Sequence, residues 1–440
     1  MERDALASLN RWCDDPFRKP LVIRGARQVG KSWLVRRFGR QFDGCAEVNF
    51  EFEPAFGRIF DRDLDPVRIL RDLSIALGTR IVPGETLLFL DEIQECPRAL
   101  TALRYFHERM SRQHVIAAGS LLDFTVERIG VPVGRVDFLH VYPMSFPEFL
   151  SATGNDRLRS TLEHEHDPRE PLPGIVHDGL MDLLGQYMAV GGMPEAVARW
   201  IETGDIVACS RVHETLVGAY RQDALKYSRK NQRPYVDIVL EAIPRLLGRK
   251  FVYSAVASEV RSRTLRSALE LLVKAQVAHR VHHTASNGLP LGAEKNPKLF
   301  KVVPLDIALA QSILGLDPGP WILDPASTLV NRGPVAEAFV GQELLAHGGP
   351  HRRAELFYWV RDKTSSKAEV DYVIASGQHI VPVEVKSGKT GKLKSMHLFL
   401  RHKPHSPLGL QLSAENFSRS GPVHRYPLYA VSTALRAIGS

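Results

Sequence analysis

Apolar residues gather in short runs between residues 20 and 125, and stretches with helical spacing separate these runs. Residues 46–52 alternate between apolar and polar positions, and residues 31–38 have the spacing of an amphipathic helix. Continuous apolar runs lie within residues 20–25, 86–92 and 114–120. Because helices cover both faces of a parallel sheet, its buried strands contain few polar positions. The pattern therefore predicts an α/β domain built on a parallel sheet.

The pattern changes after residue 153. Residues 154–179 are polar and contain proline, which is typical of a linker or an exposed insertion. Helical spacing follows, and residues 251–283 then have the pattern of a helix-turn-helix with a strand after it, as in a winged helix. We expect four parts: an α/β core (1–153), a linker with a helical lid (154–235), a winged-helix domain (236–310) and a second α/β domain (311–440).

Charge and composition narrow the class of protein. The net charge is +8, and residues 244–304 contain eleven Lys or Arg against three Asp or Glu, while residues 381–440 contain nine against two. Such basic segments indicate contact with a polyanion, although a solvated basic surface is the alternative. The four cysteines lack metal-ligand spacing, which argues against a zinc site and a disulfide framework. Without a signal peptide or a long apolar run, we expect a cytoplasmic protein that does not enter a membrane.

A loop with two glycines follows the first predicted strand. The segment fits the pattern GxxxxGK[ST] in full, between a β-branched strand and an amphipathic helix. Backbone N–H groups of such a loop converge on phosphate, the lysine reaches the β and γ oxygens, and the serine hydroxyl reaches Mg²⁺. The sequence therefore predicts a site for ATP and Mg²⁺ formed by Gly25, Ala26, Arg27, Gln28, Val29, Gly30, Lys31 and Ser32.

Two carboxylates end the next buried strand. The apolar run Leu87–Leu90 delivers Asp91 to the carboxyl edge of the sheet, where it would share Mg²⁺ with Ser32. Glu92 is then placed to orient and polarise the water that attacks the γ-phosphate. Together with the loop, these acids predict ATP hydrolysis rather than binding alone.

Two further residues are candidates for contact with the γ-phosphate. Ser120 ends the following strand and could sense this phosphate, although an ordinary serine at a strand end is the alternative. Hydrolysis also needs positive charge at the γ-phosphate in the transition state. Arg135 is the candidate, and it could act in trans across an oligomer interface; a surface ion pair is the alternative, and Arg128 is a weaker candidate.

Several motifs along the chain together resemble those of one protein family. They are RGARQVGKS, LFLDEIQ, AAGSLL, GRVDFLHVYPMSFPEFL, YMAVGGMPEAV and, far downstream, EVDYVIA with VPVEVKSG. In order and spacing they resemble a family of bacterial and archaeal ATPases that join an AAA-type P-loop domain to a C-terminal domain of unknown function 4143. The resemblance spans roughly residues 1–430. It implies a P-loop core, a helical lid, a winged helix and a C-terminal domain with the restriction-endonuclease-like PD-(D/E)xK fold.

Two strand-like segments near the C-terminus carry acids and a lysine at alternate positions. Side chains two apart share one face of a strand, so Glu384 and Lys386 point the same way, as do Glu369 and Asp371. The spacing of Asp371 and Glu384-x-Lys386 is the D…ExK arrangement of the restriction-endonuclease-like fold, and Glu337 fits its additional acid. Asp371, Glu384 and Glu337 would hold Mg²⁺, and Lys386 would steer or activate a water against a phosphodiester. A solvent-face ion pair is the alternative.

Basic residues near both predicted DNA-contacting elements support a nucleic-acid partner. The start of the second helix of the winged helix, expected at 264–275, carries Arg261, Arg263 and Arg266, where such a helix meets the major groove. A protein-docking role for the winged helix is the alternative. A second basic run would follow a phosphate backbone and consists of Lys386, Lys389, Lys392, Lys394, Arg401 and Lys403.

These observations favour an ATP-dependent DNA-processing enzyme that can form homo-oligomers. The main alternative is a nucleotide switch, a regulator or defence-type sensor whose nuclease-like domain binds DNA or a partner without cutting. A small-molecule kinase shares the loop and the acidic strand end. It would leave about 300 residues unexplained.

Overall fold

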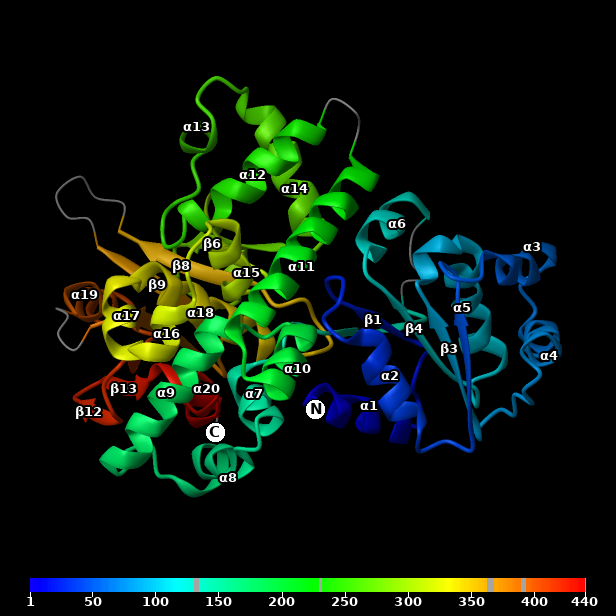
Figure 1. The fold of residues 1–440 in the computed structure, drawn as a ribbon, viewed down its shortest axis with the longest axis horizontal. Coiled ribbons are helices and arrows are strands. Elements are labelled where there is room, and N and C mark those ends of the chain that lie inside the picture. The colour runs from blue at the N-terminus through cyan, green and yellow to red at the C-terminus, as the bar shows by residue number, and fades with distance from the viewer. Residues whose placement is uncertain (130–133, 229–231, 362–367, 389–392, 440) are drawn as a thin grey trace. The chain divides into compact units, whose positions relative to one another are not determined.

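The computed structural model describes residues 1–129, 134–228, 232–361, 368–388 and 393–439 (Figure 1). The side chains of residues 126–129 and 227 are outside this description. The chain forms two compact units. The N-terminal unit contains residues 2–142 together with 348–353, and the C-terminal unit contains residues 143–347 and 354–440.

The N-terminal unit is an α/β domain on a five-stranded sheet in the order β2-β3-β4-β1-β5. Every neighbouring pair is parallel, which confirms the predicted fold class of this part. The strands are β1 (Leu21–Arg24), β2 (Gly44–Asn49), β3 (Thr86–Asp91), β4 (His114–Gly119) and β5 (Asp137–His140). The helices, drawn in blue to cyan in Figure 1, are α1 (Ala5–Asp14), α2 (Lys31–Gly39), α3 (Ile59–Arg62), α4 (Pro66–Leu77), α5 (Pro97–Arg109) and α6 (Leu122–Ile129).

Both faces of this sheet are apolar, which explains the unbroken apolar runs. Every residue of β3 and β4 is buried. Leu88 and Leu90 belong to the core on the face that α4 and α5 cover. On the other face, a Cβ on Gly39 at the end of α2 would lie 3.5 Å from a methyl group of Leu87. Helices therefore hold the carboxyl ends of β1 and β3 in place from both sides.

Residues 348–353 belong to the N-terminal unit although they follow α18 (Gly333–Ala346) in sequence. The backbone N–H of His140 in β5 donates to the carbonyl oxygen of Pro350 at 2.8 Å. Arg353 forms an ion pair with Asp123 at 3.2 Å, and Arg24 contacts the same carboxylate at 3.3 Å. The compact unit therefore differs from the predicted core of 1–153, since it ends at residue 142 and includes residues 348–353. Sequence spacing gave no sign of this distant segment.

His114 makes the stability of the N-terminal unit depend on pH. It packs between Phe42 and Trp12, with ring centroids 5.0 and 6.0 Å away, and burial with the charge of Arg18 lowers its pKa to about 4. The unfolded chain takes up this proton near pH 6.5, so stability is lost as pH falls from about 6.5 to about 4. We expect His114→Phe to remove about 2 kcal/mol of the difference in unfolding free energy between pH 7 and pH 5. Urea denaturation at both pH values measures this difference, and an unchanged difference in the variant would contradict it.

The C-terminal unit contains a mixed sheet in the order β12-β13-β11-β10-β9-β8-β6-β7. The strand that we expected at the end of a winged helix is β6, which forms an antiparallel hairpin with β7 and pairs with β8 in parallel. The strands are β6 (Ala278–Thr284), β7 (Lys295–Pro304), β8 (Leu356–Val360), β9 (Glu369–Ser376), β10 (His379–Val385), β11 (Gly409–Ser413), β12 (Ser418–Ser420) and β13 (Val423–Pro427). The expected boundary at residue 310 lies in the helix Ile307–Ile313, and the strands before and after that helix belong to one sheet.

Helices precede, interrupt and follow this sheet. In the described part of the chain, none is both long enough and apolar enough to cross a membrane. They are α7 (Phe146–Ala152), α8 (Asp156–Ser160), α9 (Gly174–Val190), α10 (Pro194–Thr203), α11 (Ile206–Tyr227), α12 (Arg233–Arg245), α13 (Tyr253–Val256), α14 (Ser262–Lys274), α15 (Ile307–Ile313), α16 (Gly319–Leu323), α17 (Pro325–Asn331), α18, α19 (Lys394–His402) and α20 (Val431–Gly439).

The expected exposed insertion at 154–179 is partly helical and partly packed. It contains α8 and the helical turn Thr161–Glu165. Leu162 is buried, and its carbonyl oxygen accepts a hydrogen bond from the hydroxyl of Thr433 at 2.9 Å. Glu163 forms an ion pair with Arg436 of α20 at 3.4 Å. These contacts come from the far end of the chain, so local composition could not predict them.

The Gly191-Gly192 pair between α9 and α10 is a packing centre of the C-terminal unit. Gly191 has a φ of 75°, where a side chain is strained. The backbone N–H of Gly192 donates to the Asp306 carboxylate at 2.7 Å, and its carbonyl oxygen accepts from the N–H of Met144 at 2.7 Å. The hydroxyl of Tyr187 donates to the Met144 carbonyl oxygen at 2.6 Å. These bonds give the Gly-Gly pair of the motif YMAVGGMPEAV a structural role.

Candidate functional site

The glycine-rich loop lies between β1 and α2, as predicted. Gly30 has a φ of 93° and Gln28 a φ of 63°, so the loop turns through left-handed conformations. A Cβ on Gly25 would lie 2.3 Å from the carbonyl oxygen of Val141, which explains why glycine stands there. The buried Lys31 Nζ donates to the carbonyl oxygens of Gly25 and Ala26 at 3.0 and 2.8 Å. The ammonium group is therefore held over the loop, where phosphate oxygens can replace these carbonyl acceptors.

The structure brings Ser32 and Asp91 into direct contact. The hydroxyl of Ser32 donates to the Asp91 carboxylate at 2.8 Å, and Asn49 Nδ2 donates to the same oxygen at 3.3 Å. Burial raises the pKa of Asp91, which is only 2% exposed. A hydroxyl and a carboxylate are oxygen ligands of the kind that Mg²⁺ prefers. The pair at the end of β3 and the start of α2 therefore fits the predicted magnesium site.

Glu92 follows Asp91 in a strained conformation. Its φ of 49° lies in the left-handed region, which costs energy in a residue other than glycine. Its carboxylate accepts hydrogen bonds from Gln94 Nε2 at 2.6 Å and from the hydroxyl of Ser120 at 3.4 Å. A Cβ on Gly119 would lie 2.2 Å from Gln94 Oε1, so a glycine is needed at the end of β4. The structure thus joins Ser120 to Glu92, and it adds Gln94, whose role the motif LFLDEIQ did not reveal.

Arg135 lies away from the glycine-rich loop of its own chain. It precedes β5, and β5 runs parallel to β1, so Arg135 lies at the amino edge of the sheet while the loop lies at the carboxyl edge. Its Nε donates to Glu108 at 2.9 Å in an exposed ion pair. Contact with a γ-phosphate in the same chain is therefore excluded. A role toward the nucleotide of a second copy stays a prediction, and the side chain of Arg128 is outside the described residues.

The predicted carboxylate–lysine cluster comes together in the C-terminal unit. Lys386 Nζ donates to Glu384 Oε1 at 2.6 Å, and the N–H of Val385 donates to Asp371 Oδ2 at 2.8 Å. Glu384 is 5% exposed, and its Oε2 has no hydrogen-bond partner among the described residues. Burial and the charge of Asp371 raise the pKa of Glu384 to about 7. A buried carboxylate oxygen without a partner fits a site for a cation.

A buried lysine that the sequence did not single out completes this cluster. Lys301 on β7 contacts Glu337 at 2.8 Å, Glu369 at 2.5 Å and Asp371 at 3.9 Å, and its side chain is 3% exposed. Burial lowers the pKa of the Lys301 ammonium, yet the three carboxylates together raise it above its ordinary value. Burial and Asp371 raise the pKa of Glu337 to about 7. Lys301 lies in the basic segment 244–304 and Glu337 was a predicted metal ligand, whereas the two form a buried ion pair.

The cluster borders a cavity of about 560 Å³. Glu337, Asp371 and Lys386 line it, and the exposed Arg249 contributes to the same wall. Among the described residues, no group of three or more His, Cys, Asp or Glu side chains is arranged to hold a metal ion by itself. A metal ion here would therefore depend on two carboxylates and on water or substrate oxygens.

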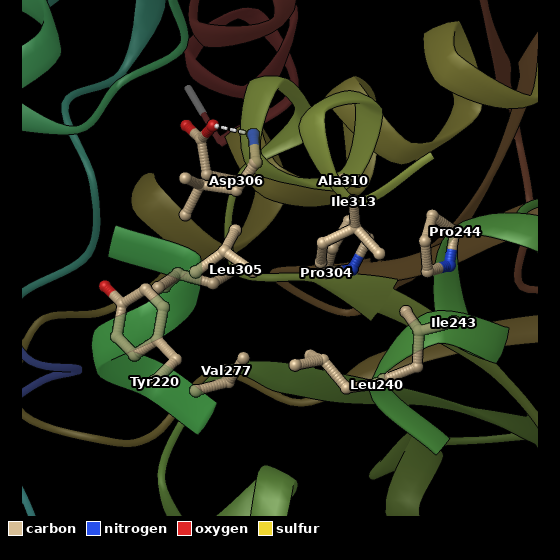
Figure 2. A pocket seen from close by; sticks show the side chains of 12 residues that line it. Tyr220, Leu240, Ile243, Pro244, Val277, Pro304, Leu305, Asp306, Ala310 and Ile313 are labelled. Atoms are coloured by element: carbon tan, nitrogen blue, oxygen red, sulfur yellow. Dashed lines mark hydrogen bonds between the residues drawn. The ribbon is translucent and has the colours of Figure 1, made fainter. Parts of the chain in front are cut away.

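A second cavity lies among α11, α12, β7 and α15, and Figure 2 shows its lining. Apolar side chains such as Leu240 and Ile243 surround it, and Asp306 lies at its border. Its volume is about 20 Å³, which is room for one water molecule. The Asp306 carboxylate is already bonded to the N–H groups of Gly192, Ala308 and Leu309. This cavity is therefore a packing defect rather than a ligand site.

The predicted DNA-contacting arginines are exposed. Arg261, Arg263 and Arg266 lie at the start of α14, while Leu265 and Leu269 on its other face are buried. Arg266 forms an ion pair with Glu270 at 3.3 Å, which reduces its free charge. In the second basic run, Lys389 and Lys392 lie outside the described residues.

Three family models match separate parts of the chain. Residues 17–150 match a model described as AAA domain. Residues 181–319 match a domain of unknown function (DUF8612), and residues 332–431 match another (DUF4143). No curated protein matches the chain.

Solved structures that match the chain share little sequence with it, and their TM-scores are below 0.5. A Walker-type ATPase of Pyrococcus abyssi has 18% identity and a TM-score of 0.43, and the alignment covers 71% of this chain and 95% of that one. The Orc1 protein of Aeropyrum pernix in complex with DNA has 13% identity and a TM-score of 0.31, with coverage of 72% and 93%. AMPPCP-bound DnaA of Aquifex aeolicus has 11% identity and a TM-score of 0.28, with coverage of 62% and 88%. The family matches and the loop geometry support an AAA-type P-loop ATPase domain at residues 17–150 and a DUF4143 domain at residues 332–431.

Proposed function

We propose that this protein hydrolyses ATP and uses the cycle to control DNA processing by a Mg²⁺-dependent nuclease-like C-terminal domain. The observation that carries the ATPase half is the contact of Ser32 with Asp91 beside the glycine-rich loop. The observation that carries the nuclease half is the buried Glu384 Oε2, which has no hydrogen-bond partner among the described residues. Its neighbours Asp371 and Lys386 line the cavity.

In the ATPase half, each residue acts through groups already close together. Lys31 exchanges its two carbonyl acceptors in the loop for oxygens of the β- and γ-phosphates. Glu92 orients the attacking water and takes up its proton as the γ-phosphate leaves. Gln94 and Ser120 fix the Glu92 carboxylate, so its position before the reaction does not depend on the substrate alone.

In the nuclease half, Asp371 and Glu384 would hold the metal ion. When bound, Mg²⁺ supplies positive charge to the scissile phosphate and lowers the pKa of a coordinated water. Lys386 holds Glu384 and lies at the wall of the cavity, where its ammonium can contact a phosphate oxygen. Arg249 at the same wall would neutralise the adjoining phosphate of the DNA backbone.

Contact with DNA would use the exposed positive charge at the start of α14. The exposed arginines Arg261, Arg263 and Arg266 would bind phosphates or base edges from the start of α14. The proposed DNA binding rests on the exposure and charge of these residues. It predicts that the affinity for DNA falls steeply as the salt concentration rises.

Cleavage tests the nuclease half directly. We expect Asp371→Asn to lower Mg²⁺-dependent cleavage of plasmid and branched DNA to below about a hundredth of the wild-type rate, because one of two metal carboxylates is lost. The matched control is Asp317→Asn, an exposed acid outside the cluster, which should cleave like the wild type. Gel assays with Mg²⁺ or Mn²⁺, with and without ATP, measure both.

The same assay separates the proposal from a nucleotide switch. Absence of cleavage in the wild type under every nucleotide condition would remove the nuclease half. If ATP turnover is then slow and changes the oligomeric state in sedimentation, the protein is a switch that binds DNA or a partner. Fast turnover that DNA stimulates would count against the switch.

A further inference from the structure

We propose that Lys301 is a fixed internal cation of the carboxylate cluster, so that the cluster takes one divalent cation, between Asp371 and Glu384, and not two. The inference rests on the proposed nuclease-like function and names what the site binds. It concerns four carboxylates, of Glu337, Glu369, Asp371 and Glu384, and two ammonium groups, of Lys301 and Lys386.

Lys301 occupies the part of the cluster between α18 and β9. Its Nζ lies 2.8 Å from Glu337 Oε1 and 2.5 Å from Glu369 Oε1, which are the contacts of an ammonium group that shares two carboxylates. Its side chain is 3% exposed and lies on the Tyr358 ring, 5.4 Å from the centroid. A buried ammonium with these contacts leaves only at a large cost, because it would leave unpaired carboxylates behind.

The other part of the cluster has free acceptor capacity. Asp371 Oδ2 accepts from the Val385 N–H, while its Oδ1 lies 3.9 Å from Lys301, beyond a hydrogen bond. Glu384 gives Oε1 to Lys386 and keeps Oε2 without a partner in the described part of the chain. The oxygens Asp371 Oδ1 and Glu384 Oε2 therefore remain for one cation.

Charge balance gives the same count. Four carboxylates and two ammonium groups leave a formal charge of −2 when all are ionised, which one divalent cation balances. A second divalent cation would add positive charge beside the Lys301 ammonium in a buried site, where repulsion is poorly screened. Lys301 thus excludes the second cation both by position and by charge.

The test counts bound Mn²⁺ in the full-length protein without nucleotide. All variants carry Asp91→Asn, which removes metal binding at the P-loop site. Electron paramagnetic resonance of free Mn²⁺ should give one bound ion per chain in this background and close to none when Asp371→Asn is added. Adding Lys301→Met should raise the count to two, and Lys301→Arg should keep it at one. Circular dichroism shows whether each variant is folded.

A second variant keeps the test decisive if Lys301→Met fails to fold. Glu369 is 37% exposed, and Glu369→Gln alters a partner of Lys301 without touching the two proposed ligands. We expect one Mn²⁺ per chain and a Kd within about threefold of the parent. Two ions in the parent, a single ion in a folded Lys301→Met variant, or lost binding in Glu369→Gln would each overturn the role of Lys301. No Mn²⁺ in any variant would instead remove the metal-dependent nuclease itself, and the single-cation site with it.

Discussion

Substitution of Lys31 by methionine should lower ATP turnover by about 100-fold or more. The ammonium group donates to two carbonyl oxygens of the glycine-rich loop, which hold it where the phosphates would bind. Methionine keeps the length of the side chain but removes the charge, so the phosphate oxygens lose one of their cations as negative charge develops in the transition state. Steady-state phosphate release measures the loss.

The control for Lys31→Met stands on the same helix. Arg36 is exposed and forms an ion pair with Glu47 at 2.7 Å, so Arg36→Met removes a positive charge from α2 without affecting the loop. We expect this variant to keep turnover within about twofold of the wild type. Turnover that survives Lys31→Met at the wild-type level would mean that ATP is hydrolysed elsewhere.

Substitution of Gly192 by alanine should destabilise the C-terminal unit by roughly 3 kcal/mol or more. A Cβ at this position would lie 2.1 Å from the Met144 carbonyl oxygen and 2.9 Å from the Tyr187 hydroxyl oxygen. The first contact is with a backbone atom, which cannot move away by a change of rotamer as a side chain can. Relief would break the hydrogen bond from Gly192 to Asp306 and leave a buried carboxylate short of a donor.

Gly218→Ala provides the comparison for Gly192→Ala. Gly218 lies within α11, and a Cβ there meets nothing within 4 Å. Alanine favours a helix more than glycine does, so this variant should gain about 0.5–1 kcal/mol. Urea denaturation followed by far-UV circular dichroism compares the two variants. Equal stability of Gly192→Ala and the wild type would mean that the packing at Met144 relaxes more easily than the distances indicate.

Features that depend on neighbours in sequence could be predicted. The glycine-rich loop is contiguous, and Asp91 lies at the end of an unbroken apolar strand, so spacing alone located the Ser32–Asp91 contact. The alternation of side chains put Asp371 on one face of its strand and Glu384 with Lys386 on one face of theirs, and the D…ExK spacing joined them into one cluster, as the contacts show. The spacing of a loop motif and the alternation of side chains along a strand are local properties, so they can be predicted from the sequence.

Features that depend on pairing between distant segments could not be predicted. Lys301 enters the cluster because β6 pairs with β8, and no spacing rule connects the hairpin to that strand. Arg135 was the candidate for contact with the γ-phosphate, yet it precedes β5, which runs parallel to β1, so it lies at the far edge of the sheet from the loop. In both cases the role of a charged residue depends on a partner that only the tertiary fold brings into contact with it.

The placement of residues 348–353 has a practical consequence for dissecting this protein. The chain leaves the N-terminal unit after residue 142, returns at 348 and leaves again after 353. A fragment that stops at residue 142 would lack the acceptor for the His140 N–H and one of the two arginines at Asp123. Cleavage after residue 142 would therefore separate residues 1–142 from the hexapeptide 348–353, which stays on the C-terminal fragment. An isolated ATPase fragment needs this hexapeptide grafted back before its activity can be compared with that of the whole chain.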